Sequence, residues 1–266
     1  MKTLREIAIR RRAGDKSFLV GGHRGSSGTA PENTLASFAE AVSAGADLVE
    51  TDVQITSDGY VVVFHDKNIS RTTDGSGQVK QTEFAKFRDL DAGSWFSDRF
   101  KGEHVPLLSD VIKLIRNKCY LNIEVKNIEG DSLDDNIHRI IEVITTEGYR
   151  DYTLFSSFYY RTLFQLKKEF PNIPTAAIRI PKDKRLPSEI ASDIGCEVFV
   201  CSTDEITEDV ENDLVKSNII TGVYSIDDEE TLIEMVKKPI TALVTNYPAK
   251  IIDSMNKLNI PKAKYV

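Results

Sequence analysis

The sequence contains no hydrophobic run that approaches the roughly 20 residues needed to cross a membrane. Its first segment, Met1 to Asp15, is rich in Lys and Arg and lacks the continuous apolar core of a signal peptide. Repeats, flexible linkers and low-complexity tracts are absent as well. We therefore expect a cytoplasmic protein with no stable membrane insertion.

Cysteine is scarce, because only Cys119, Cys196 and Cys201 occur among 266 residues. An odd number of cysteines in strand-like runs argues against a disulfide framework and predicts buried free thiols. The absence of a Cys-x-x-Cys pair argues against zinc. A net charge of −7 argues against a nucleic-acid-binding surface. It does not exclude an anionic small-molecule substrate, since a metal ion and a few cations can reverse the local potential.

Short apolar runs alternate with amphipathic segments along the whole chain. Eight strands separated by helices in about 250 residues predict an α/β fold, the (β/α)8 TIM barrel. The predicted strands are Phe18–Gly22, Asp47–Val53, Cys119–Val125, Tyr152–Ser157, Thr175–Ile180, Glu197–Cys201, Gly222–Ile226 and Ala242–Thr245. The predicted helices include Leu35–Ala44, Leu108–Asn117, Leu133–Glu147, Tyr160–Phe170, Glu205–Ser217 and Glu229–Lys237.

A ninth apolar run, Tyr60–His65, interrupts this alternation. The Asp58-Gly59 pair before it is a hairpin signal. A parallel neighbour would need a crossover of about a dozen residues, so we expect this run to pair antiparallel with the second strand. Residues 54–106 are then a small insertion in a single 1–266 domain, on the side of the barrel that carries the active site.

Three carboxylates lie on two of the predicted strands. Glu50 and Asp52 are two residues apart, so both side chains point to the same face near a strand end. Glu124 repeats the pattern on the next barrel strand. Buried carboxylates need a compensating cation, and oxygen ligands favour Mg²⁺, Ca²⁺ or Mn²⁺ over zinc. We predict one divalent cation at these three residues, Mg²⁺ or Ca²⁺ with Mn²⁺ as a third candidate; a surface Glu-x-Asp on an edge strand is the alternative.

Two cations accompany the carboxylates. Arg24 follows the first predicted strand, and its planar guanidinium suits two phosphate oxygens. Lys126 comes two residues after Glu124, where it could hold a phosphate oxygen or form a buried ion pair with Glu124.

Two of the four histidines fall at motif ends. His23 directly follows the first strand and His65 ends the hairpin run, so the two could act as a general acid–base pair on a phosphate. An isolated histidine is more often structural, as we expect for His104 and His138. Asn33 precedes an apolar helical run, and we expect it to be the helix N-cap.

Taken in order, these groups resemble the motifs of the glycerophosphodiester phosphodiesterase family. The resemblance implies a TIM barrel with a small insertion and a divalent-metal-dependent phosphodiesterase. It assigns the acid–base pair to His23 and His65, and the metal to Glu50, Asp52 and Glu124. It assigns the phosphate to Arg24 and Lys126. It extends from Gly21 to about Pro248 through Pro31-Glu32-Asn33-Thr34, Arg71-Thr72-Thr73-Asp74-Gly75-Ser76-Gly77, Asp91-Ala92-Gly93-Ser94-Trp95-Phe96 and Val244-Thr245-Asn246-Tyr247-Pro248.

Two departures from the family pattern concern the last strands. The family usually has Trp-Thr-Val-Asn where this chain has Tyr224-Ser225-Ile226-Asp227, and Thr-Asp-x-Pro where it has Thr245-Asn246-Tyr247-Pro248. They bear on the alcohol group of the substrate, because Phe158 and Tyr224 are the expected walls of its pocket. Asp227 adds a negative charge that would disfavour an anionic headgroup.

The predicted reaction is hydrolysis of a small glycerophosphodiester to glycerol 3-phosphate and an alcohol, with water or the adjacent glycerol hydroxyl as nucleophile. A lysophospholipase D-type enzyme is the first alternative, and a silent barrel that binds a phosphorylated ligand is the second. The lipid alternative needs an apolar landing surface, for which the insertion offers Phe84, Phe87, Trp95, Phe96 and Phe100. Oligomeric state, headgroup and the choice between Mg²⁺ and Ca²⁺ stay open.

Overall fold

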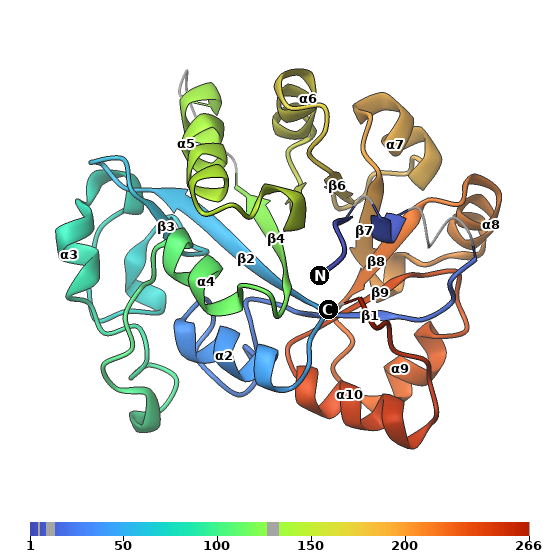
Figure 1. Ribbon diagram of the computed structural model, residues 1–266, viewed down its shortest axis with the longest axis horizontal. Helices are drawn as coiled ribbons and strands as arrows, with labels where there is room; N and C mark the ends of the chain where they lie inside the picture. The colour runs from blue at the N-terminus through green and yellow to red at the C-terminus, as the bar shows by residue number, and fades with distance from the viewer. Residues whose placement is uncertain (5, 9–13, 127–132, 266) are drawn as a thin grey trace.

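The computed structural model describes residues 1–4, 6–8, 14–126 and 133–265. Within these residues, eight parallel strands close into a barrel because β1 pairs with both β2 and β9 (Figure 1). The predicted TIM barrel is therefore confirmed. Its strands are β1 (Leu19–Gly22), β2 (Leu48–Ile55), β4 (Tyr120–Val125), β5 (Thr153–Ser157), β6 (Thr175–Ile178), β7 (Val198–Ser202), β8 (Ile220–Tyr224) and β9 (Ala242–Thr245).

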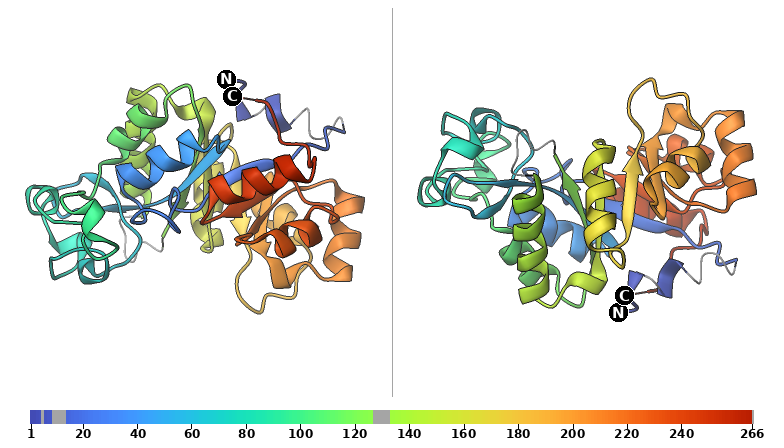
Figure 2. Two further views of the ribbon diagram at one scale, coloured as in Figure 1. Left: turned by 90° about the horizontal axis from the view of Figure 1, so that it is seen from below. Right: turned by 90° about the horizontal axis from the view of Figure 1, so that it is seen from above.

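Helices surround the barrel and follow its strands (Figure 2). The β2 strand shows how they are packed: Val49 and Val53 belong to a hydrophobic cluster with the helices, whereas Glu50 and Asp52 alternate with them on the other face. The helices are α2 (Leu35–Ser43), α4 (Leu108–Ile115), α5 (Leu133–Thr146), α6 (Tyr160–Glu169), α7 (Pro187–Ile194), α8 (Glu208–Ser217), α9 (Glu229–Met235) and α10 (Pro248–Lys257), with short 3₁₀ turns η4 (Arg150–Tyr152) and η5 (Thr203–Glu205).

The ninth apolar run folds back as predicted. Its central part, β3 (Val61–Val63), pairs antiparallel with β2, with Val63 opposite Val53. The chain then passes through η1 (Ile69–Arg71), η2 (Val79–Gln81), α3 (Phe84–Arg88) and η3 (Asp98–Phe100) at one side of the barrel (Figure 1).

This segment has a hydrophobic cluster of its own. Phe64, Ile69 and Val79 pack there with Phe87 and Val105, apart from the clusters beneath the barrel helices. A polar cluster, the Asp91 hub, adds to it. The Asp91 carboxylate accepts hydrogen bonds from the backbone N–H groups of Gly93, Ser94 and Gly102.

Some element bounds differ from the predicted ones. The β8 strand runs two residues earlier than predicted, because Asn218 ends α8 in a left-handed conformation and Ile220 already pairs with Val198. The α7 and α10 helices, each with proline in its first turn, were not among the predicted helices.

The three cysteines are free, with Cys119 and Cys201 buried and Cys196 half-buried. In the part of the chain that the structure describes, no helix combines the length and the apolar character needed to span a membrane.

Candidate active site

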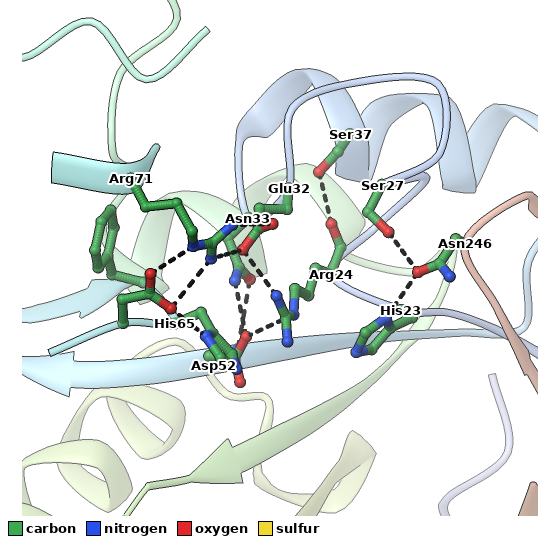
Figure 3. Close-up of polar contacts among 12 residues, drawn as sticks. His23, Arg24, Ser27, Glu32, Asn33, Ser37, Asp52, His65, Arg71 and Asn246 are labelled. Atoms are coloured by element: carbon green, nitrogen blue, oxygen red, sulfur yellow. Dashed lines mark hydrogen bonds and ion pairs between the residues drawn. The ribbon is translucent and has the colours of Figure 1, made fainter. Parts of the chain in front are cut away.

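The sequence-predicted polar residues meet at the carboxyl ends of β1, β2 and β4. Figure 3 shows four of them, His23, Arg24, Asp52 and His65. Parallel pairing sets their heights, because Asp52 is opposite Glu124 and Glu50 is opposite Asn122. The carboxyl ends of the parallel strands form the face on which TIM-barrel enzymes carry their active sites.

A tight turn after β1 places His23 and Arg24. Gly25 has φ +82°, and a Cβ there would lie 2.4 Å from the Ser37 hydroxyl oxygen, so only glycine fits. Because the turn passes so close to α2, the Ser37 hydroxyl donates a hydrogen bond to the Arg24 carbonyl (2.9 Å). The Arg24 backbone N–H in turn donates to Glu50 Oε2 at 2.9 Å.

The three carboxylates form one buried group, whose ligand oxygens all lie within 4.8 Å of one another. Burial and the like charges of Asp52 and Glu124 raise the pKa of Glu50 well above its usual value. Its Oε1 atom has no hydrogen-bond partner. A buried oxygen without a donor, inside an all-oxygen group, fits a hard divalent cation.

Arg24 and Lys126 supply two positive charges to this group. Arg24 Nε lies 3.2 Å from Asp52 Oδ2. Lys126 Nζ lies 2.7 Å from Asp52 Oδ1 and 2.6 Å from Glu124 Oε1. Burial alone would raise the pKa of Asp52, but these two cations outweigh it and lower that pKa. The ion pair between Lys126 and Glu124 that the sequence offered as an alternative is thus present.

Asn33 does not cap α2, so the N-cap prediction is wrong. Thr34 is the cap, with its hydroxyl oxygen accepting the Ser37 N–H. Asn33 has φ +60°, and its side chain turns towards β2, donating to Asp52 Oδ2 at 2.9 Å and accepting from the Thr51 hydroxyl at 3.1 Å. It therefore orients a carboxylate of the candidate metal group.

The two histidines flank the carboxylates with different partners. His23 Nε2 lies 3.9 Å from Glu50 Oε2, and its Nδ1 lies 2.7 Å from the Asn246 side-chain oxygen. Burial and the neighbouring Arg24 charge lower the pKa of His23, which favours a neutral imidazole. His65 Nδ1 instead contacts the Asp66 carboxylate at 2.5 Å.

A network beyond these residues was missed at the sequence level. Arg71 Nε donates to Asp66 Oδ2 at 2.5 Å, and its two Nη atoms bond Glu32 at 2.9 and 2.7 Å. Glu32 also accepts from Arg24 Nη1 at 2.8 Å (Figure 3). Although burial opposes it, hydrogen bonding from Arg71 and His65 lowers the pKa of Asp66 to about 2. The His65-Asp66 pair was the available signal; the partner Arg71 depends on how the insertion folds.

A cavity of about 480 Å³ opens beside the site. It is bounded by the end of β2, the start of α5 and the insertion, and His65 and Lys126 form part of its wall. Phe158 and Tyr224 are half-buried at the ends of β5 and β8 but do not line this cavity. Their role as walls of the alcohol pocket stays a prediction.

The remaining two histidines lie outside the site. The His104 ring contacts the Leu90 carbonyl, and His138 Nε2 lies 3.1 Å from Glu169 Oε2.

A closed TIM barrel with buried carboxylates, an arginine, a lysine and two histidines at its mouth has the groups that hydrolysis of a phosphate ester requires. Residues 23–250 match the model of the glycerophosphoryl diester phosphodiesterase family. The chain belongs to this family. Its predicted class, an enzyme that is a phosphoric diester hydrolase, is confirmed.

Individual relatives agree with this assignment. The chain is 33% identical to a glycerophosphodiester phosphodiesterase from Caldanaerobacter subterraneus subsp. tengcongensis, over 90% of this chain and 98% of that protein. A phosphodiesterase from Oleispira antarctica, solved in complex with the product sn-glycerol-3-phosphate, is 32% identical with a TM-score of 0.84, covering 90% and 96% of the two chains. A glycerophosphodiester phosphodiesterase from Agrobacterium tumefaciens is 25% identical with a TM-score of 0.79, covering 89% and 99%.

Proposed function

We propose that this chain hydrolyses a small glycerophosphodiester to glycerol 3-phosphate and an alcohol, using one divalent cation and the pair His23 and His65. The carrying observation is the group formed by Glu50, Asp52 and Glu124, whose ligand oxygens lie within 4.8 Å of one another. Figure 3 shows one of them, Asp52, between the two histidines. The relative from Oleispira antarctica, which binds sn-glycerol-3-phosphate, supports the glycerol phosphate half of the substrate.

In this proposal Glu50, Asp52 and Glu124 hold Mg²⁺ or Ca²⁺. The bound cation would supply positive charge for the phosphoryl oxygens as their charge grows in the transition state. Arg24 and Lys126 would bind phosphate oxygens directly, adding charge-assisted hydrogen bonds. Both side chains are partly exposed, at 18% and 23%. Each can therefore reach a ligand at the barrel mouth without a rearrangement of the surrounding chain.

His23 and His65 would carry the protons. One takes a proton from the nucleophile, which is water or the adjacent glycerol hydroxyl, and the other gives a proton to the leaving alkoxide. Replacing either residue, His23→Ala or His65→Ala, should lower kcat by about 10²–10⁴-fold with an unchanged melting temperature. Full activity in either variant would contradict this assignment.

We further propose that residues 54–106 form an insertion unit of one barrel domain. Three of its aromatic residues support it from within, since Phe64, Phe87 and Phe100 are buried. Trp95, at 41% exposure, is the observation that favours a second candidate function, a lysophospholipase D-type enzyme that touches a lipid surface. The cytoplasmic location stays a prediction.

The test is release of glycerol 3-phosphate from glycerophosphocholine and glycerophosphoethanolamine, with Mg²⁺ or Ca²⁺ and then with excess EDTA. We expect metal-dependent release that EDTA abolishes. Turnover of micellar lysophospholipid but not of the soluble diesters would establish the second candidate instead. Release that persists unchanged in EDTA would refute the role of the carboxylate group.

A further inference from the structure

The Asn246 side chain links the candidate catalytic His23 to a carboxylate in the loop that follows β8. Its Oδ1 lies 2.7 Å from His23 Nδ1 and accepts from the Ser27 hydroxyl at 2.8 Å. Its Nδ2 donates to Asp227 Oδ2 at 2.6 Å. Figure 3 shows Asn246 beside His23 and Ser27. The carboxylate lies just beyond it, after β8.

Asp227 is itself held firmly. Its Oδ1 accepts from the Thr245 hydroxyl at 3.0 Å and from the Asn246 backbone N–H at 2.8 Å. The Lys250 ammonium donates to its carbonyl oxygen at 2.7 Å. The carboxylate therefore has no freedom to turn away from the Asn246 amide.

This arrangement determines which way the amide points. An ionised carboxylate only accepts hydrogen bonds, so the Asn246 group that faces Asp227 must be the NH₂ group. The carbonyl oxygen Oδ1 must then face His23. Since an amide oxygen only accepts, His23 Nδ1 must carry a hydrogen, and in the neutral ring the lone pair is on Nε2.

We propose that Asp227 and Asn246 are positioning residues that hold the His23 ring with its hydrogen on Nδ1, so that Nε2 is the atom left to exchange a proton with the reacting groups. The proposal rests on the proposed function, since it concerns how His23 is prepared to accept a proton. Within the described part of the chain, the hydrogen bonds of both side chains go to other partners than the three carboxylates that would hold the cation. Both act only through the ring.

The same network gives Asp227 and Asn246 a joint role. Both residues are among the positions at which this chain departs from the family pattern, and their side chains are the two ends of one hydrogen bond. The Asp227 charge is therefore directed at Asn246 and Thr245, and not into the cavity of about 480 Å³. If the carboxylate were moved from position 227 to position 246, its negative charge would stay within the same chain of hydrogen bonds.

The first test is Asp227→Asn. The amide oxygen of the new asparagine would accept hydrogen bonds from the Thr245 hydroxyl and the Asn246 backbone N–H. Its NH₂ group would then face the Asn246 side chain. That side chain should then rotate, present its own NH₂ group to His23 and force the Nε2–H tautomer. Because the ring stays in place without a usable lone pair, we expect kcat to fall by about 10²–10⁴-fold while KM changes less than about two-fold.

A rescue variant separates positioning from folding. In the double variant Asp227→Asn and Asn246→Asp, the carboxylate at 246 accepts from His23, Ser27 and the new amide, so every donor again has an acceptor. We expect most of the lost kcat to return. Asp228→Asn is the matched control, because it removes the same charge one residue away and asparagine still caps α9; its kcat should match the wild type.

The tautomer itself can be observed without turnover. Nitrogen-15 NMR of histidine-labelled full-length protein with Mg²⁺ should show a protonated Nδ1 for neutral His23, assigned by its loss in His23→Ala. The signal pattern should reverse in Asp227→Asn and return in the double variant. An Nε2–H tautomer in the wild type would overturn the proposal. So would a loss of kcat in Asp227→Asn that comes with a lower melting temperature and is not rescued in the double variant. The correct tautomer in a protein that hydrolyses no diester would instead refute only the proposed function.

Discussion

Replacing Glu50 with glutamine should stabilise the metal-free protein while it weakens metal binding. Glu50 is 6% exposed, and its Oε1 has no donor. Its ligand oxygen lies at most 4.8 Å from those of Asp52 and Glu124, and two unit charges that close repel by at least about 3.5 kcal/mol at an effective dielectric constant of about 20. Arg24 and Lys126 offset part of this repulsion. We therefore expect Glu50→Gln to raise the free energy of unfolding without metal by about 1–2 kcal/mol.

The glutamine keeps one carbonyl oxygen for the Arg24 backbone N–H, so the turn after β1 should persist. For a chain of this size, about 1–2 kcal/mol corresponds to a melting temperature roughly 2–8 °C higher. The assay is thermal unfolding in EDTA, followed by calorimetry to confirm a single transition.

Adding Mg²⁺ should reverse the order of the two proteins. A ligand at 100 times its dissociation constant stabilises the native state by about 2.7 kcal/mol. The wild type should gain this amount, and the variant, with a ligand oxygen lost, should gain little. Glu142→Gln, on the exposed side of α5, is the control and should show the wild-type response. A Glu50→Gln protein that is less stable than wild type in EDTA, with an equal Mg²⁺ response, would refute the reasoning.

Two further predictions concern the insertion. Arg71→Lys cannot bridge Asp66 and Glu32 with one planar group, so we expect kcat to fall about ten-fold at unchanged melting temperature, with exposed Arg88→Lys as control; equal activity of both would contradict it. Backbone N–H groups of Ser94 and Gly102 lower the pKa of Asp91. The contribution of the Asp91 carboxylate to folding stability is therefore fully present above the usual carboxyl pKa, and it is lost as the pH falls through the lowered pKa of the folded state. Asp91→Asn should therefore speed amide hydrogen exchange at residues 93–102 at neutral pH, and the difference from wild type should shrink in acid; equal exchange at neutral pH would contradict it.

The barrel could be predicted because its strands can be recognised from the local pattern of apolar residues. Strands of a parallel barrel can be continuous apolar runs, as in Val198–Cys201, and the short link before β3 leaves no room for a parallel crossover. Helix α10 was missed because its apolar positions are interrupted by polar residues and its start is marked only by Pro248. The insertion offered turn residues without periodicity, and its course depends on contacts such as the Asp91 hub.

The polar residues of the candidate site could be selected by type and spacing, but their partners could not. Glu50 and Asp52 share a face by strand geometry alone, which the register with Glu124 then completes. Asn33 shows the limit: its position before a helix suggests a cap, yet its left-handed backbone turns the amide to Asp52. Local sequence favours both conformations, and a contact 19 residues away decides between them.

Closure of the barrel accounts for the site contact whose partners lie furthest apart in the sequence. His23 follows β1 and Asn246 follows β9, so the two meet because these strands pair with Gly22 opposite Thr245. They are 223 residues apart in the chain. Asp227 follows β8, the next strand round, and it reaches Asn246 from there. Each partner follows a different strand, so its distance from the next is set by strand order and register, which local sequence patterns do not encode.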